Sequence, residues 1–148
     1  MATQAIRIEK EVLTVAAVGL VGWLIPGGGY FVLGDKKRGT IVLVTLLLTF
    51  LVGLYIGSIG VIDPVGAKPW YVAQVMNSPI VILIGNVVAH GYEVYSQTKD
   101  ASQAYFVFGR ACEIGQIYTS IAGLLNLLCI VNAVYIAHTR AIAGSKGT

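Results

Sequence analysis

The residues from Gly29 to Lys36 come closest to a known chemical motif. Their pattern, Gly-Tyr-Phe-Val-Leu-Gly-Asp-Lys, differs by one inserted residue from a phosphate-binding loop. Such a loop needs a Ser or Thr directly after the lysine, to bind Mg²⁺, and a buried strand before its first glycine. Here Lys37 follows the lysine, and no strand pattern precedes the glycines. We therefore predict no nucleotide site.

Two histidines, His90 and His138, are the natural candidates for haem ligation in a helical membrane protein. Each falls at the end of a predicted helix, and in antiparallel helices they would lie near opposite faces, about 30 Å apart. One haem cannot bridge that distance. We therefore predict no cofactor of the protein's own, only contacts with lipid or with a pigment or haem that a partner holds.

Other residue types that carry chemistry are equally sparse. Cys112 and Cys129 are 17 positions apart on one predicted helix, which separates them by about 25 Å and prevents a disulfide within one copy. No Ser–His–Asp, Cys–His or zinc-ligand spacing is present. The acidic residues all fall at predicted helix ends or in loops, whereas ion pathways place ionisable groups inside a span. The sequence therefore predicts a protein that is not an enzyme.

The composition is that of an integral membrane protein. Charged residues make up 11% of the 148 residues and hydrophobic residues 56%, whereas a soluble domain is about one quarter charged. The net charge is only +3 and the basic residues are scattered, which excludes a nucleic-acid-binding surface. The predicted partners are membrane lipids and other integral membrane subunits.

Four stretches lack any charged side chain for 21 residues or more, namely 12–34, 40–62, 72–92 and 114–137. About 20 helical residues cross the hydrocarbon core of a bilayer. We therefore predict a single all-α membrane domain, 1–148, with four spans. Its parts are an interfacial lead at 1–11, a broken span at 12–34, spans at 40–62, 78–95 and 112–138, and a tail at 139–148.

Two connecting segments are predicted between these spans. Residues 63–77 contain prolines and aromatic residues typical of an interfacial loop. Ser78 and Pro79 have the pattern of a helix N-cap and first helical residue, so the third span is expected to begin there. Residues 102–108 are predicted to be a short amphipathic segment on the membrane surface.

The first span is interrupted by Pro26, Gly27, Gly28 and Gly29. Proline removes a backbone donor, and the glycines add freedom that a regular helix does not need. Because unsatisfied backbone is costly in lipid, this break must be buried against protein, hydrated or interfacial. Two geometries remain open, a kinked helix that continues across the membrane and a re-entrant hairpin. We favour the kinked span.

Small residues recur at helical spacing on two predicted spans. Gly53 and Gly57 form a small-xxx-small pair, more typical of a contact within the chain than of a dimer motif here. On the last span, Gly115, Thr119, Gly123 and Asn126 fall on one stripe. Asn126 and Asn132 are expected to form hydrogen bonds between helices. These residues and the Pro26–Gly29 break are the predicted helix-packing and interaction sites.

The orientation depends on the first segment. The cluster Lys36, Lys37 and Arg38 is expected to face the cytoplasm. If the first segment spans, five basic residues fall on each side of the membrane, and the loops alone place both termini outside. A re-entrant first segment would bring the N-terminus inside.

Two segments resemble small bacterial membrane proteins related to the two-transmembrane-helix domain family. Ile25-Pro-Gly-Gly-Gly-Tyr-Phe-Val-Leu-Gly34, followed by Lys37-Arg-Gly39, is similar to their Pro-Gly-x-Gly-x-Phe-Tyr-Leu-Gly pattern, with Gly28 in place of the usual aliphatic residue. Residues 113–133 resemble the C-terminal signature of one such uncharacterised family. The resemblance implies a helical fold in the bacterial inner (cytoplasmic) membrane, multi-pass, without known catalytic residues.

Two classes of function fit these observations. The first is a structural or accessory subunit of a larger membrane complex, of the electron-transport or photosynthetic kind. The second is a self-standing channel, carrier or membrane-organising homo-oligomer. Helices with small-residue faces and no site of their own favour the first.

Overall fold

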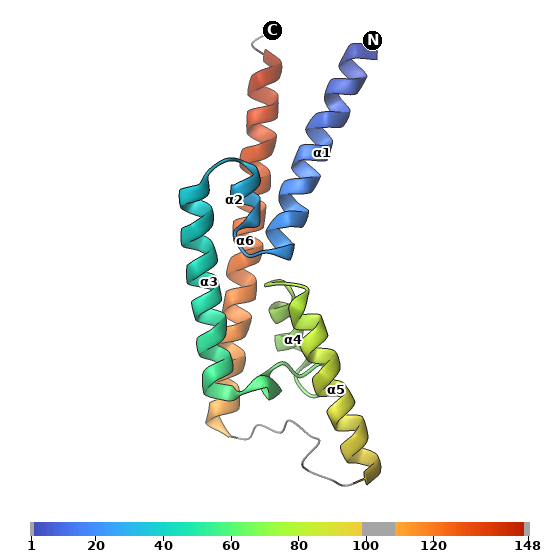
Figure 1. Ribbon diagram of the computed structural model, residues 1–148, viewed down its shortest axis with the longest axis vertical. Helices are drawn as coiled ribbons and strands as arrows, with labels where there is room; N and C mark the ends of the chain where they lie inside the picture. The colour runs from blue at the N-terminus through green and yellow to red at the C-terminus, as the bar shows by residue number, and fades with distance from the viewer. Residues whose placement is uncertain (1, 99–108, 147–148) are drawn as a thin grey trace. The chain divides into compact units, whose positions relative to one another are not determined.

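The computed structural model describes residues 2–98 and 109–146 (Figure 1). Within these ranges the chain forms helices and no strand, which confirms the all-α prediction. The helices are α1 (Ala2–Leu24), α2 (Gly28–Val32), α3 (Lys36–Gly57), the 3-10 helix η1 (Ile59–Val61), α4 (Lys68–Val75), α5 (Ile80–Thr98) and α6 (Arg110–Lys146). The predicted amphipathic segment 102–108 lies outside the described residues.

The chain divides into two compact units. Unit 1 comprises Met1–Val44 and Asn126–Thr148, and unit 2 comprises Thr45–Leu125. Helices α3 and α6 are divided between the two units. Residues 36–44 of α3 and 126–146 of α6 belong to unit 1, and residues 45–57 of α3 and 110–125 of α6 belong to unit 2. Each unit has its own buried apolar cluster.

Unit 1 is built around a helical hairpin. Helix α1 runs without a break from the predicted lead to Leu24, and the chain then reverses so that α2 returns along α1 (Figure 1). Gly28 faces the backbone of Val21, and Gly29 faces Val18 one turn earlier on α1. This is the hairpin geometry and not the kinked helix that the sequence favoured. The reversal uses Gly27, whose φ of 77° is in the left-handed region where glycine has no steric penalty.

The C-terminal part of α6 completes unit 1. It runs antiparallel to α1, because Gly19 of α1 lies beside Val134 and Gly22 beside Ile130. The N-terminal end of α1 and the C-terminal end of α6 therefore lie at the same end of this unit (Figure 1). The buried cluster of unit 1 consists of Val18, Tyr30, Ala133 and Ala137.

Unit 2 contains a second hairpin, formed by α4 and α5. Residues 63–77, predicted as a loop, include the eight-residue helix α4, with a proline in its first turn. As the sequence indicated, the next helix begins directly after Ser78 and Pro79, and the Ser78 hydroxyl lies 3.4 Å from the amide nitrogen of Ile80. The buried cluster of unit 2 consists of Phe50, Val61, Ile62, Val81 and Ala122.

Two of the described helices are long and apolar enough to cross a membrane. They are Lys36–Gly57 and Arg110–Ala143. Only 22% and 33% of the apolar 18-residue stretches of these two helices are buried. This fits helices that face lipid better than the core helices of a soluble protein. The apolar part of α1, Val12–Leu24, is shorter. The predicted number of four spans therefore stays a prediction.

Candidate helix-packing and polar sites

The glycines of the N-terminal break lie where two backbones meet. Gly27, Gly28 and Gly29 are buried, and Pro26 is half-buried in the turn. A Cβ at Gly28 would overlap the carbonyl oxygen of Val21, and one at Gly29 would lie 2.9 Å from the carbonyl oxygen of Val18. Side chains at these positions would therefore separate α2 from α1.

Asn126 supports the same hairpin from α6. Its side chain is fully buried, and its Nδ2 donates to the carbonyl oxygen of Gly22 at 3.2 Å. Gly22 lies in the last turns of α1, where carbonyl groups near a helix end lack partners within the helix. The amide of Asn126 thus connects α6 to the end of α1. Asn132, the second asparagine predicted to bond between helices, is exposed.

In unit 2, the two predicted small-residue stripes face one another. A Cβ at Gly53 would lie 3.0 Å from the carbonyl oxygen of Gly115 and 2.7 Å from the Cγ2 of Thr119. Conversely, a Cβ at Gly115 would lie 2.8 Å from the carbonyl oxygen of Gly53, and one at Gly57 would lie 3.2 Å from the Cα of Gly115. The structure therefore brings α3 and α6 together within one chain through these four residues.

Gly123 extends this stripe toward α4. A Cβ at Gly123 would overlap the carbonyl oxygen of Ala73 and would lie 3.3 Å from the amide nitrogen of Asn77. Since both neighbouring atoms belong to backbone, neither can move away as a flexible side chain could. The absence of a side chain at Gly123 therefore allows the backbone of α4 to lie directly against α6.

A buried polar cluster next to these glycines was not predicted. Gln74 of α4 is fully buried, and its Nε2 donates to the carbonyl oxygen of Val61 at 3.1 Å and to the hydroxyl oxygen of Thr119 at 2.8 Å. Thr119 in turn donates to the carbonyl oxygen of Gly115 at 2.8 Å. Ser120 donates to the carbonyl oxygen of Trp70 at 3.2 Å. These bonds fix the register of α4 on α6.

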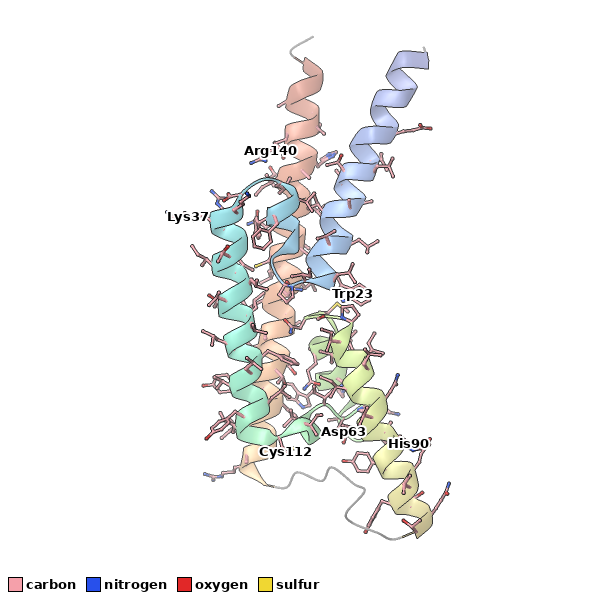
Figure 2. The ribbon with its side chains drawn as sticks, viewed as in Figure 1. Trp23, Lys37, Asp63, His90, Cys112 and Arg140 are labelled. Carbon is pink, nitrogen blue, oxygen red and sulfur yellow. The ribbon has the colours of Figure 1, made fainter. Side chains whose placement is uncertain are left out.

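The titratable residues form no assembled site in the part of the chain that the structure describes. His90 is 78% exposed at its side chain and lies 3.9 Å from Glu93 on the same helix. Asp63 accepts from the amides of Val65 and Gly66 and lies 3.4 Å from the Tyr92 hydroxyl, so it shapes the turn between η1 and α4 (Figure 2). Over 2–98 and 109–146, no three His, Cys, Asp or Glu side chains could hold one metal ion.

Unit 2 also has an open apolar groove. It has a volume of about 300 Å³ and lies along α4 and the start of α5. Its lining consists of Tyr71, Val72, Val75, Met76 and Ile82. None of these five side chains is charged, and four of them are aliphatic or a methionine.

Comparison with known proteins gives one family. The model of a family of unknown function, DUF6677, matches residues 17–146. No curated protein and no solved structure matches the chain. The match covers most of the sequence, from the last turns of α1 to the end of α6, so the chain belongs to this uncharacterised family. The narrower resemblance to the two-transmembrane-helix domain proteins stays a prediction.

Proposed function

We propose that this member of DUF6677 is a non-catalytic protein of the bacterial inner membrane, where it is an accessory subunit of a larger complex. The observation that carries the proposal is a pair of exposed asparagines, Asn86 and Asn132, inside apolar stretches of helix. Both require a partner that lipid tails do not supply.

Asn132 lies on the part of α6 that is long and apolar enough to cross a membrane. It is exposed, and the apolar side chains around it, Leu128 and Val131, are 65% and 59% exposed. The asparagine amide has two hydrogen-bond donors and an acceptor, whereas hydrocarbon offers no hydrogen-bonding group. A hydrogen bond from another membrane helix would satisfy it and is worth about 0.6 to 2 kcal/mol.

Asn86 repeats this pattern on α5. It is exposed between Leu83 and Val87, which are 66% and 51% exposed. Asn126, by contrast, is buried and bonds to a carbonyl group of its own chain. The outward asparagines therefore favour contact with other integral subunits, while the inward one serves the fold of this chain.

Complexes of electron transport or photosynthesis are the parent assemblies that we propose first. Small helical subunits without a site of their own fit such complexes. In this proposal the chain has no cofactor, and any pigment or haem near it is held by a partner. A self-standing channel, carrier or membrane-organising homo-oligomer is the alternative, because a second copy could also bond to Asn132.

We further propose that the chain crosses the membrane twice, through α3 and α6, and that both hairpins are re-entrant. In this proposal the reversal of α1 into α2 returns the chain to the side on which it entered, and the reversal of α4 into α5 returns it to the side on which α3 ended. Two crossings agree with the two helices that are long and apolar enough to span. This arrangement has two spans fewer than the four expected from hydropathy alone.

The basic residues then fall unequally on the two sides. In this topology the chain order puts Arg7, Lys10, Lys36, Lys37, Arg38, Arg140 and Lys146 on one side. Within the described residues, Lys68 and Arg110 fall on the other side. Basic residues concentrate on the cytoplasmic side of bacterial membrane proteins. Both termini are therefore proposed to face the cytoplasm.

Cysteine labelling tests this topology. In a variant whose native Cys112 and Cys129 are replaced by serine, single cysteines at Ala2, Lys37 and Ser145 are expected to resist a membrane-impermeant maleimide in intact spheroplasts. All three should react after permeabilisation. A cysteine at Lys68 should react in both conditions. Labelling of Ala2 and Lys37 from opposite sides would restore a spanning first segment.

Isolation from native membranes tests the assembly role. Native mass measurement after mild detergent extraction is expected to show this chain with other integral subunits in fixed stoichiometry. Asn132→Leu should weaken that association about 3- to 30-fold, the factor that corresponds to one hydrogen bond between membrane helices. Val131→Leu, an apolar exchange at the adjacent exposed position, is the matched control. A pure homo-oligomer that conducts ions would instead support the alternative.

A further inference from the structure

A strongly basic surface lies in unit 1 where α2 turns into α3. It is formed by Lys36, Lys37 and Arg38 in the first turn of α3 and by Arg140 of α6, and we call it the basic surface. Lys37 and Arg140 are labelled near this turn in Figure 2. All four side chains belong to exposed residues. Neither the packing sites nor the exposed asparagines account for this cluster.

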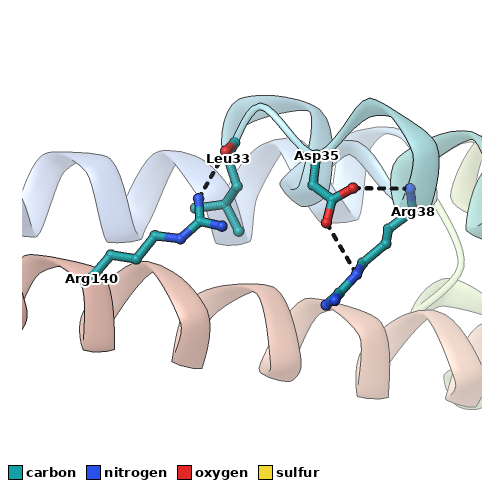
Figure 3. A network of polar contacts seen from close by, with 4 residues as sticks. All are labelled: Leu33, Asp35, Arg38 and Arg140. Carbon is teal, nitrogen blue, oxygen red and sulfur yellow. Dashed lines mark hydrogen bonds and ion pairs between the residues drawn. The ribbon is translucent and has the colours of Figure 1, made fainter.

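The basic surface is held together by contacts between its elements. Arg140 donates from Nη1 to the carbonyl oxygen of Leu33 at 2.9 Å, which connects α6 to the end of α2 (Figure 3). Asp35 accepts from the amide of Arg38 at 3.2 Å, and its other oxygen lies 3.0 Å from Arg38 Nε. Gly34, with a φ of 80°, allows the chain to turn between α2 and α3. Arg140 of α6 and Arg38 of α3 are thus each bonded to a residue of the α2–α3 turn.

The charge of this surface is largely uncompensated. The surface has four cationic residues and one carboxylate, Asp35, and both oxygens of that carboxylate are engaged by Arg38. No ion pair of Lys36 or Lys37 occurs among the described side chains, and both lysines are exposed. An excess of positive charge on one surface attracts anions. Arginine also presents several donors in a fork that fits the oxygens of a phosphate.

Exposed apolar residues come just before the basic turn in the chain. Phe31 and Val32 of α2 are 38% and 44% exposed. The Phe31 ring packs on α3, where a Cβ at Gly39 would lie 3.1 Å from it. The surface therefore combines phosphate-binding groups with an exposed apolar edge. A soluble phosphate compound would use only the first, whereas a phospholipid uses both.

We propose that the basic surface binds the phosphate headgroups of anionic phospholipids, with their acyl chains against Phe31 and Val32. The proposal rests on the proposed location in the inner membrane. It places the α2–α3 turn and the C-terminal part of α6 at the headgroup level of one leaflet. Anionic lipid attracts basic residues near the membrane surface, and the attraction declines with salt.

Lipid titration of the purified full-length chain in detergent tests the proposal and needs no partner complex. Native mass spectrometry is expected to show that phosphatidylglycerol binds more tightly than phosphatidylcholine of the same chain length. The double variant Lys36→Gln with Lys37→Gln should weaken phosphatidylglycerol binding roughly 10- to 30-fold, as expected for two basic residues near an anionic headgroup. Higher salt should weaken binding to the wild-type chain.

Control variants and a competition with inorganic phosphate make the outcome decisive. Lys68→Gln, a basic residue in unit 2, should leave phosphatidylglycerol binding unchanged. Arg140→Lys, which retains the charge, should bind the lipid more tightly than Arg140→Gln. Equal binding of the two lipids, or an unchanged Lys36/Lys37 double variant, would overturn the proposal. So would displacement of the lipid by inorganic phosphate at equal concentration, because the site would then recognise free phosphate.

Discussion

Replacing Gly123 with alanine is expected to lower the free energy of unfolding by about 3 kcal/mol, at the upper end of the usual cost of overpacking. The new Cβ would overlap the carbonyl oxygen of Ala73. Relief requires α4 to move away from α6. That movement would lengthen the bonds from Gln74 to Thr119 and from Ser120 to Trp70, which are 2.8 and 3.2 Å long.

Unfolding in mixed detergent micelles, followed by tryptophan fluorescence, measures this effect. Gly19→Ala is the matched control, because a Cβ there would meet only the Cγ2 of Val134 at 3.4 Å, an ordinary contact distance. Alanine is also a better helix former than glycine by about 1 kcal/mol, so the control should be neutral or stabilising. Equal losses at Gly19 and Gly123 would contradict the close approach of α4 to α6.

The small-residue stripes could be identified from the sequence because they depend on helical periodicity alone. Gly53 and Gly57, or Gly115 and Thr119, are four positions apart, and this spacing places residues on one face of any α-helix. Which stripe faces which is not encoded in the spacing. The structure supplies that pairing by placing Gly53 against Gly115 and Thr119.

Gln74 could not be identified in the same way. Helix α4 has only eight residues, too few for an apolar pattern to repeat, and the prolines around it indicate a loop. A glutamine in such a segment is usually exposed to water. Its burial follows from tertiary contacts with Val61 and Thr119, which are 13 and 45 residues away in the sequence. A proline followed by a short apolar run was the one signal of a helix in this segment.

The sequence also could not show whether the chain continues or reverses after α1. The charge-free stretch 12–34 is long enough to span a membrane, but length does not record whether the chain continues or reverses. The decision depends on the left-handed backbone at Gly27 and on the approach of Gly28 to Val21. A kinked helix and a hairpin share the same proline and glycines, so the sequence left both geometries open.

Replacing Gly28 with leucine is therefore the substitution that separates the two geometries. In the hairpin, the new side chain would overlap the backbone of Val21 and force α2 away from α1, with an expected loss of about 3 kcal/mol or more in the free energy of unfolding. Val32→Leu, at the exposed end of α2, should change it by less than about 0.5 kcal/mol. The same micelle assay measures both variants.

The Gly28 result also bears on the orientation of the chain. Separation of α2 from α1 would displace Leu33, whose carbonyl oxygen accepts the bond from Arg140, so Gly28→Leu should weaken phosphatidylglycerol binding as well as stability. In a kinked, continuous span, residue 28 would face lipid or a neighbouring helix, and leucine would be tolerated there. A stable Gly28→Leu variant would then imply that α1 crosses the membrane, which would place the N-terminus on the face opposite Lys37.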